Sequence, residues 1–582
     1  MSIFSKTPIN KPKRNLFNLS YQNKFSCNLG QLVPIMCKPV VPGDTFKCST
    51  ELFVRTAPLV SPMFQQLDVY VHYFYVPNRL ICSDWEQYIS PHATKDNPTP
   101  SELQLPSIDL RYKKTFQFTN QILFGNGTLM DFLGYHGQLE STSDENALVA
   151  SILPVNAYNL IYQSYYCDQN LGLASRVDDP LLLDEMKVYG ANDGFEEKYE
   201  GDAGEPLINY FSLRQRCWKK DYFTSALPFT QRGADVHLPL YGNASVVGTG
   251  ATEVSVDSIK DYNLTGGILP KGSYDAKVVV GDDVTKSNLV GTHVLSGVPL
   301  AGVLNHSHPA SLSNKELAQK LSVELDNVSA ATINELRRAT RLQQYLETSA
   351  RVGGRYKEFV LGHFGVNVPD GRLQRPEYLG GGVCKISIGE VTQTSMTVNS
   401  GDDVAALGQM AGRGSAYGNS NSFKHSFPEH GYVMAIMSIQ PKAAYFQGVS
   451  RDLLKQDRLD IYTPEFANLG EQPITNAELY AQGPKPKETF GYTPRYAEYK
   501  FSLDEIHGQF RETLDTWHMA RMFGEQPTLS NKFIEVNENE DGLNRVFAVP
   551  GTSDNPVEHF YVYVQNNIKA LRPMPVFGVP TL

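Results

Sequence analysis

Three short runs of β-branched and aromatic residues, separated by hundreds of positions, constrain the fold most strongly. Leu67–Pro77 reads LDVYVHYFYVP, residues 431–440 read GYVMAIMSIQ, and residues 558–565 read EHFYVYVQ. This composition is typical of β-strands, and nearly continuous apolar runs are expected of strands that are covered on both faces. If the three strands share one wall, the segments between them are excursions from a single β core. The pattern predicts a sandwich or jelly roll with long insertions.

A capping pattern marks one clear helix. Ile333–Val352 carries apolar residues at helical spacing, Thr332 and Glu335 form a T-x-x-E capping box at its start, and two glycines follow its last residue. We therefore assign residues 331–352 to an amphipathic helix that is inserted into the β core. A second, weaker helical pattern covers residues 156–168.

Three stretches have the composition of surface excursions. Residues 190–206 are acidic, residues 241–305 are rich in Gly, Val, Ser and Thr without Arg, Phe, Trp or Cys, and residues 400–422 are rich in Gly and Ser. The first is predicted to be a solvated loop and the last a flexible loop. Within the longest stretch, residues 246–247 and 277–281 are candidates for short strands that pair between copies of the chain.

The charge is unevenly distributed along the chain. The formal net charge is −10, which does not indicate nucleic-acid binding, yet the first fifty residues hold seven basic residues and a single acid, Asp44. A basic arm at residues 1–16 can neutralise phosphates and release their counterions. The side chains that would face DNA are Lys6, Lys11, Lys13 and Arg14. The competing interpretation, which the sequence alone favours, is a solvated terminus without a partner.

A search for catalytic chemistry finds little. The sequence has no G-x-x-x-x-G-K-[ST] phosphate loop, no G-x-S-x-G nucleophile elbow and no H-E-x-x-H zinc motif. Two histidine pairs, His306 with His308 and His425 with His430, would bind a metal only if the fold supplied a third ligand. We therefore expect no cofactor, no metal and no catalytic residue.

The cysteines and the apolar segments indicate the compartment. Seven scattered cysteines without a C-x-x-C pair are compatible with a reducing cytoplasm and give little support to a disulfide framework or a zinc site. No apolar run approaches the ~18 residues that span a membrane, and the polar start lacks the apolar core of a secretory signal. No membrane insertion is expected.

A series of short motifs gives the chain a specific likeness. In order they are FNLS at 17–20, GQLVP at 30–34, VPGD at 41–44, RTAPL at 55–59, HYFYVPNRL at 72–80, YNLIYQSYYCDQNL at 158–171, KKDYFTSALPFTQRG at 219–233, HFGV at 363–366, RLQRPEYLGGG at 372–382, EHGY at 429–432, FGY at 490–492, RYAEY at 495–499 and VFGVP at 576–580. In content and order they resemble the major capsid proteins of the microvirus family of small icosahedral single-stranded DNA phages. The stretch at residues 241–305 resembles the gokushovirus branch, whose capsid proteins carry an inserted loop.

The resemblance implies a mainly β fold. A single capsid domain over residues 1–582 would have an eight-stranded antiparallel jelly roll of the viral capsid type as its discontinuous core, with long loop and helical insertions. The implied function is that of a major capsid protein, not an enzyme, which assembles in the host cytoplasm into a T=1 icosahedral shell around circular single-stranded DNA. The implied location is the virion. The implied partners are further copies of the chain, the genome, a small basic DNA-packaging protein, an internal scaffolding protein, a pilot protein and a host surface receptor.

The inserted stretch and two rival functions stay open at this level. We assign residues 241–305 to the outer surface, as a protrusion where neighbouring subunits meet; a tolerated insertion without a partner is the equal alternative. The candidates for host attachment or for contacts in a three-fold protrusion are Tyr262, Lys271, Tyr274 and Lys277. One rival is a large β-sandwich carbohydrate-active enzyme, which needs two carboxylates across a cleft. The other is a nucleic-acid-binding module, which needs a basic groove with stacking aromatics.

Overall fold

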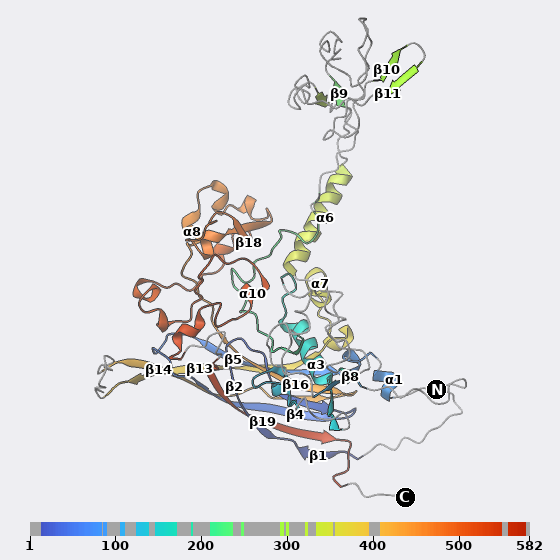
Figure 1. Cartoon of the computed structure of the whole chain (residues 1–582), viewed down its shortest axis with the longest axis vertical. Coiled ribbons are helices and arrows are strands. Elements are labelled where there is room, and N and C mark those ends of the chain that lie inside the picture. The colour runs from blue at the N-terminus through green and yellow to red at the C-terminus, as the bar shows by residue number, and fades with distance from the viewer. Residues whose placement is uncertain are drawn as a thin grey trace. The chain divides into compact units, whose positions relative to one another are not determined.

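The chain divides into two compact units in the computed structural model. One unit comprises Met1–Ala234 and Tyr345–Leu582, and the other comprises Asp235–Gln344 (Figure 1). The structure describes residues 13–83, 85–89, 105–110, 124–138, 146–171, 188–189, 210–234, 236, 246–248, 292–295, 298–301, 321–323, 333–352, 355–394, 408–549 and 557–577.

The first unit is built on one ten-stranded antiparallel sheet. The strand order is β1-β19-β4-β14-β13-β5-β16-β3, with β2 also paired to β19 and β15 also paired to β4. The strands are β1 (Asn15–Asn18), β2 (Tyr21–Cys27), β3 (Val33–Val40), β4 (Thr45–Thr56), β5 (Leu67–Pro77), β13 (Glu377–Thr392), β14 (Met410–Asn419), β15 (Phe423–Ser426), β16 (Gly431–Pro441) and β19 (Phe560–Arg572).

Strand β13 divides this sheet into two layers. Its residues 377–386 pair with β5, and its residues 387–392 pair with β14. We call β1, β2, β4, β14, β15 and β19 the β19 layer. We call β3, β5, β16 and the first part of β13 the β16 layer. Because β13 belongs to both, the two layers are parts of one continuous hydrogen-bonded sheet.

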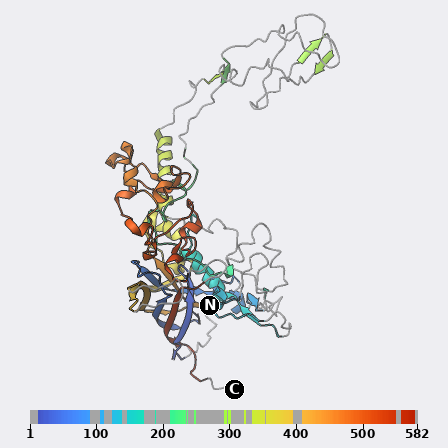
Figure 2. The ribbon, with the colours of Figure 1, turned by 60° about the vertical axis from the view of Figure 1, so that its left-hand side comes forward.

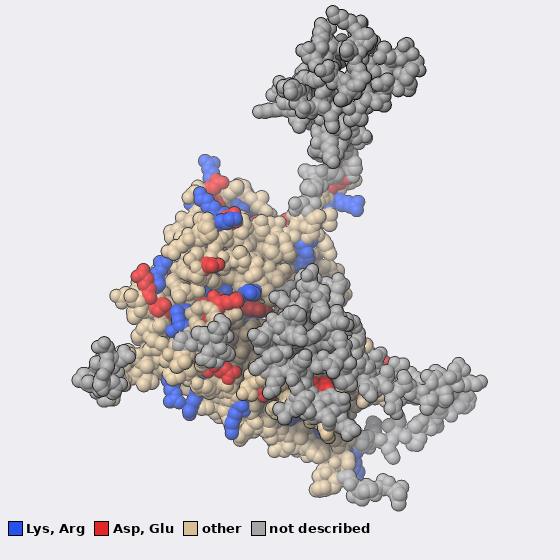
Figure 3. All heavy atoms as spheres, in the orientation of Figure 1, with Lys and Arg blue, Asp and Glu red and all other residues tan. Residues whose placement is uncertain are grey.

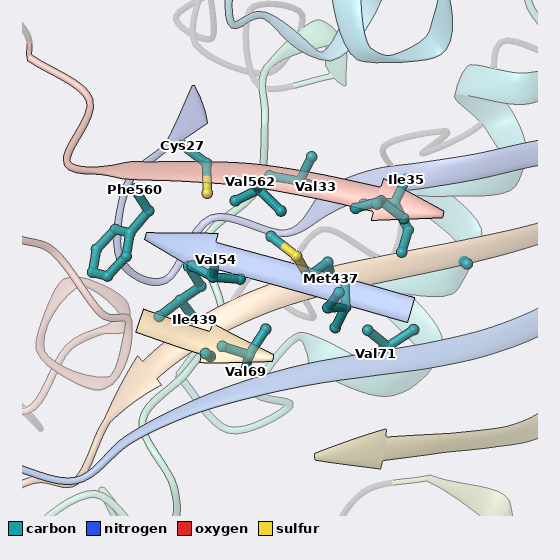
Figure 4. Close-up of a cluster of buried hydrophobic side chains, with 14 of the residues drawn as sticks. Cys27, Val33, Ile35, Val54, Val69, Val71, Met437, Ile439, Phe560 and Val562 are labelled. Atoms are coloured by element: carbon teal, nitrogen blue, oxygen red, sulfur yellow. The ribbon is translucent and has the colours of Figure 1, made fainter. Parts of the chain in front are cut away.

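The two layers share the main hydrophobic core. Val54 and Val562 of the β19 layer and Val71, Met437 and Ile439 of the β16 layer are almost fully buried in it (Figure 4). Successive side chains of a strand point to opposite faces, so every second residue reaches this core. Each fully buried large aliphatic side chain contributes about 1.5–3 kcal/mol. This packing holds the two layers together.

The β16 layer is covered on its other face as well. Phe74 of β5 and Met434 and Ile436 of β16 pack in a second buried cluster with helix α3 (Leu153–Ile161), whose Tyr158 is fully buried. Strands β5 and β16 therefore have apolar cover on both faces. Their nearly continuous apolar sequences predicted this arrangement.

The prediction that residues 67–77, 431–440 and 558–565 belong to one wall is confirmed. They form or overlap β5, β16 and β19, which are all strands of the ten-stranded sheet. Strand β19 departs from the expectation of two covered faces. Its buried and exposed residues alternate, and the outward Tyr561 is 51% exposed. The β19 layer thus presents an open outward face among the described residues.

This antiparallel two-layer architecture with long insertions and few helices confirms the predicted jelly-roll fold class. The sheet has ten strands where eight were expected, because the N-terminal strands β1 and β2 both pair with β19. Figure 2 shows the result, with the red C-terminal strand beside the blue N-terminal strands. The two ends of the chain therefore close the same layer.

Both predicted helices are present. Helix α6 spans Ile333–Val352, the range that the sequence indicated, while Thr332 of the expected capping box lies outside the described residues. The weaker pattern at residues 156–168 corresponds to α3 and the π-helical η3 (Tyr162–Tyr166). Among the described helices, none combines the length and the apolar character needed to cross a membrane.

The remaining elements are short. The helical ones are η1 (Asn78–Leu80), α1 (Trp85–Ile89), α2 (Leu129–Leu133), α7 (Tyr356–Phe364), η6 (Asp370–Leu373), α8 (Arg451–Leu454), η7 (Arg458–Asp460), η8 (Pro464–Phe466), α9 (Asn476–Leu479), η9 (Ala497–Tyr499), η10 (Gly508–Arg511), η11 (Asp515–Trp517), α10 (Asn531–Ile534) and η12 (Leu543–Val546). The strands are β6 (Ser107–Asp109), β7 (Val149–Ser151), β8 (Val188–Tyr189), β17 (Glu471–Thr475) and β18 (Thr489–Pro494) in the first unit. The second unit contains β9 (Val246–Gly248), β10 (Thr292–Leu295), β11 (Val298–Ala301) and β12 (Leu321–Val323).

The predicted flexible loop at residues 400–422 is wrong for its second half, where β14 lies. The glycines in this strand allow neighbouring segments to approach closely. A Cβ atom on Gly412 would lie 2.5 Å from the carbonyl oxygen of Ser61, and one on Gly418 would overlap the Sγ of Cys384. Glycine here serves close packing, which composition alone does not distinguish from flexibility.

The predicted strand at residues 246–247 is present as β9. Within the single chain it pairs antiparallel with β12, and pairing between copies of the chain stays a prediction. Strands β10 and β11 form a separate antiparallel pair. The other predicted strand, at residues 277–281, and the acidic stretch at residues 190–206 lie outside the described residues.

Replacing Gly412 by Ala should destabilise the fold. The new Cβ would lie 2.5 Å from the Ser61 carbonyl oxygen and 2.9 Å from the Cα of Pro62, and overpacking of this kind costs about 1–3 kcal/mol. The measurement is the urea midpoint at an unchanged m-value. Ser415→Ala, on the exposed side of the same strand, is the matched control and should change little. Equal midpoints for both variants would contradict the close packing.

Candidate functional site

The structure places two of the predicted site residues. Lys13 and Arg14 of the basic arm are exposed and lead directly into β1, at the edge of the β19 layer. Outside the described residues lie Lys6, Lys11, Tyr262, Lys271, Tyr274 and Lys277. The described part of the arm is therefore attached to the sheet.

The histidine pairs do not gather metal ligands in the part of the chain that the structure describes. His425 Nε2 lies 3.6 Å from the carboxylate of Glu377. Glu429 does not turn to its neighbour His430, because it forms an ion pair with Arg79 at 2.8 Å. The pair formed by His306 and His308 lies outside the described residues.

Exposed apolar side chains gather on one segment between β16 and β17, near α8 in Figure 1. We call this segment the apolar platform, and its members are Leu453, Leu459, Ile461, Tyr462 and Leu469. Leu453 is 79% exposed and Ile461 is 59% exposed. Single exposed apolar residues are common in soluble proteins, whereas large contiguous apolar patches mark interaction sites.

Polar side chains fix the backbone of the platform. The Tyr496 hydroxyl donates hydrogen bonds to the carbonyl oxygens of Leu459, at 3.0 Å, and Ile461, at 3.2 Å. Arg451 pairs with the buried carboxylate of Glu478 at 3.0 Å. Tyr496 has a φ of 58°, which non-glycine residues seldom adopt. Because its backbone is held in place while its apolar side chains face solvent, the segment would lose little conformational freedom on binding a partner.

A buried ion pair ties β19 to the rest of the fold. His559 Nδ1 lies 2.8 Å from the Glu538 carboxylate, His559 Nε2 lies 3.1 Å from the Val549 carbonyl oxygen, and the ring stacks on Phe547. The other carboxylate oxygen of Glu538 accepts the backbone N–H of Leu29 at 2.7 Å. Both ring nitrogens face acceptors, so only the protonated imidazolium can donate to both.

The same contacts explain the charge of this histidine. Burial lowers the pKa of His559, but the hydrogen bond from the imidazolium to Glu538 and the negative charge of that carboxylate outweigh burial and raise the pKa above its ordinary value. Both nitrogens are used within the fold. The cluster is therefore suited to a structural role rather than to proton transfer with a substrate.

Comparison with known proteins identifies the family. A family model described as capsid protein (F protein) matches residues 5–582. The chain belongs to this capsid protein family. The match includes both the strands of the sandwich and the platform segment, so the capsid protein is covered almost from end to end.

Three relatives extend the match. Capsid protein VP1 of Chlamydia phage 1 is 32% identical over 618 residues, which cover 100% of this chain and 97% of the relative. Capsid protein VP1 of Bdellovibrio phage phiMH2K is 32% identical, with 99% and 97% covered, and that of Spiroplasma virus 4 is 29% identical, with 100% and 97% covered. The predicted resemblance to microvirus capsid proteins of the gokushovirus branch is confirmed. The chain is a major capsid protein and a component of the virion.

Two motifs of the capsid protein have anchoring positions in the structure. Tyr496, from RYAEY, holds the platform, and Tyr222, from the motif at residues 219–233, donates a hydrogen bond to the buried Glu478 at 2.7 Å. The sequence showed these motifs but not the platform beside them. The one sequence feature that could have predicted the platform is the high proportion of apolar residues at 453–469. These residues follow neither a helical nor a strand period, so the pattern did not stand out.

The pH dependence of stability tests the buried ion pair. Because the pKa of His559 is raised in the folded protein, its contribution is complete below the ordinary value of 6.5 and is lost as pH rises through the folded value. Between pH 6 and 9 the wild type should lose about 1 kcal/mol of unfolding free energy from this contact. His559→Gln should lack this component in urea titrations, whereas His507→Gln, at an exposed site, should retain it. A His559→Gln variant with the wild-type pH profile would refute the assignment.

Proposed function

We propose that this capsid protein assembles with copies of itself into a closed T=1 icosahedral shell around circular single-stranded DNA, as a structural protein rather than an enzyme. The observation that carries the proposal is the apolar platform. Its side chains face solvent in the single chain although polar anchors fix its backbone, as expected of a surface that a neighbouring copy covers. The three relatives named capsid protein VP1 support the same role.

The two-layer sandwich supplies the rigid element that a shell requires. Layers joined by a densely packed core deform little, so segments anchored at their margins keep fixed positions. In a closed symmetric shell every contact recurs on each copy, and no single interface needs to be strong. The platform, anchored by Tyr496 and Arg451, is suited to such repeated contacts.

The use of buried ionisable groups supports a structural role. Arg521 and Asp541 form a buried ion pair at 2.7 Å, and Arg521 also donates to the backbone carbonyl of Phe533. The buried Glu478 is engaged by Arg451 and Tyr222. These buried groups are engaged by partners within the fold, and the contact of Tyr222 with Glu478 joins distant segments of the chain. This use of the buried charges gives the rival carbohydrate-active enzyme no support.

Further roles extend this proposal to the basic arm and to the inserted stretch, most of whose residues lie outside the described residues. The basic arm at residues 1–16 contacts the genome through Lys6, Lys11, Lys13 and Arg14. The stretch at residues 241–305 lies on the outer surface and takes part in host attachment through Tyr262, Lys271, Tyr274 and Lys277. Assembly takes place in the host cytoplasm with a small basic DNA-packaging protein, an internal scaffolding protein and a pilot protein, and attachment requires a host surface receptor.

Two sets of variants test the proposed roles of the basic arm and of the inserted stretch. Ala replacement of the four arm residues should lower genome retention, and more so at high salt, because electrostatic contacts weaken as salt rises. Replacing residues 251–298 by a short Gly/Ser linker should reduce attachment to host cells while empty shells still form. If the arm variant packages DNA normally across a salt series, the proposed contact between the arm and the genome is refuted. If the linker variant attaches to host cells as the wild type does, the proposed role of the insertion in attachment is refuted.

Shell formation tests the main proposal. Wild-type protein should give uniform hollow shells in negative-stain electron micrographs. Leu453→Ser with Ile461→Ser should abolish or strongly reduce shells while the urea midpoint stays near that of the wild type, because both side chains are already exposed in the single chain.

Leu148→Ser is the matched control, since Leu148 is 57% exposed and lies outside the platform. It should assemble like the wild type. A wild-type protein that remains a monodisperse monomer would count against the capsid proposal. Equal assembly by all three proteins would refute the role of the platform while leaving the shell itself standing.

A further inference from the structure

The strand order of the main sheet ends at two strands that differ in how they are protected. One end is β3, which contains Pro34, Lys38 and Pro39 and has a register shift in its pairing with β16. Prolines, charges and bulges are features that prevent an edge strand from pairing with another chain. The other end is β1, whose sequence Asn-Leu-Phe-Asn has no proline and no charge and whose register with β19 is continuous. Strand β1 is therefore an edge that can accept a further strand.

The backbone groups of two residues in β1 point away from β19. In an antiparallel pair, residues whose N–H and C=O groups face the partner strand alternate with residues whose groups face away. The N–H of Leu19 donates to the carbonyl oxygen of Ile568 at 2.9 Å, in register with the pairing of β1 and β19. The odd-numbered residues therefore face β19. The backbone groups of Leu16 and Asn18 face the other side, where they have no hydrogen-bond partner among the described residues. We call this side of β1 the open edge.

Apolar side chains lie uncovered beside the open edge. Leu16 is 66% exposed, and the chain that follows β19 stays next to β1, because the side-chain amide of Asn15 donates to the carbonyl oxygen of Met574 at 2.7 Å. Farther along, Phe577 is 85% exposed, the highest value among the large apolar side chains in the described part of the chain. In Figure 3 the lower margin of the body, where Figure 1 labels β1, is mainly tan, the colour of residues other than Lys, Arg, Asp and Glu. Contact with another chain would remove this apolar surface from water.

We propose that the open edge pairs with the open edge of a second copy across a twofold axis, so that the sheet continues from one subunit into the next. Symmetry favours this occupant over an unrelated strand. A twofold axis relates identical residues, and Leu16 and Asn18 face the edge in both copies, so each strand offers the other matching donors and acceptors. The inference rests on the proposed shell, because an icosahedral shell has twofold axes between its subunits.

Two registers satisfy this symmetry. In one, Leu16 lies opposite Leu16 of the second copy, and Arg14 lies opposite Asn18. In the other, Leu16 lies opposite Asn18, and Phe17 lies opposite Phe17 of the second copy. The first register places the two exposed leucines against each other, whereas the second places leucine against asparagine, so the first buries more apolar surface. It also sets Arg14 opposite an uncharged residue and brings no like charges together. The proposal therefore includes the first register.

Disulfide formation by the full-length protein tests the pairing and its register. Leu16→Cys would place two thiols opposite each other at a Cα separation of about 5.5 Å, which a disulfide can span. The oxidised variant should therefore run as a covalent dimer on a non-reducing gel. Asn18→Cys is the matched control, because it is exposed in the same strand. Its Cα would lie about 14 Å from its copy along the strand at ~3.4 Å per residue, so it should give at least about fivefold less dimer.

Two results of this experiment would overturn the proposal. Wild-type protein, oxidised in parallel, corrects for the seven native cysteines. Equal dimer yields from Leu16→Cys and Asn18→Cys would show that the edges do not pair. A higher yield from Phe17→Cys than from Leu16→Cys would show that the second register is the real one.

A proline separates the backbone hydrogen bonds from the side-chain contact. Leu16→Pro and Leu16→Ala both remove the leucine side chain, but only proline also removes the N–H that would pair with the second copy. This N–H does not face β19, so both variants should keep the pairing of β1 with β19 and have similar urea midpoints. Leu16→Pro should give about threefold fewer shells than Leu16→Ala in negative-stain micrographs. Equal shell yields at equal midpoints would overturn the edge pairing.

The disulfide yield in particles and in free protein distinguishes a failure of this inference from a failure of the proposed function. If the wild type forms shells, and shells of Leu16→Cys contain no more covalent dimer than shells of Asn18→Cys, the edge pairing fails and the shell proposal stands. If the wild type forms no shells but Leu16→Cys still gives the predicted dimer, the shell proposal fails and the edge pairing stands.

Discussion

The packing between the β19 layer and the β16 layer is the interaction on which the other features depend. Strand β13 contributes to both layers, so the sheet is continuous, and apolar side chains from both sides fill the space between them. Alternation along a strand then fixes the rest: once Val562 and Val564 point inward, Tyr561 and Tyr563 must point outward. A shift of one residue would exchange the two sets, so the core determines which side chains the outward face presents.

Much of the fold could be predicted because several elements are marked by the sequence of the element itself. Strands β5 and β16 are nearly continuous apolar runs, and α6 has a helical period, so their positions followed directly from the sequence. Strand β14 could not be predicted in this way. Its glycines are required because other segments pack closely against them, such as Ser61 against Gly412 and Cys384 against Gly418. Ser61 is more than 300 positions from Gly412 in the sequence, and Cys384 is more than 30 positions from Gly418. The exposed side of β19 was missed because apolar composition does not show which face is covered.

The candidate surfaces were harder to predict than the fold. On the outward face of the β19 layer, Lys47, Lys424 and Lys569 come together only through the pairing of three strands. Net charge was misleading here, because an average of −10 over the chain conceals a face with six exposed basic residues and one acid. A basic surface with aromatic rings was also the feature expected of a separate nucleic-acid-binding module.

The pairing of the two chain ends has a consequence for synthesis. Strand β4 has β14 and β15 along one edge and β19 along the other, and β4 ends at Thr56 whereas β19 begins only at Phe560. At about 5–20 residues per second, a ribosome needs roughly half a minute or more after making β4 before it makes β19. Throughout that time the N-terminal strands have no partner on this edge, and a prematurely ended chain never acquires one. The order of strands along the sheet therefore acts as a check on synthesis, because the wall closes only in chains that have been translated as far as β19.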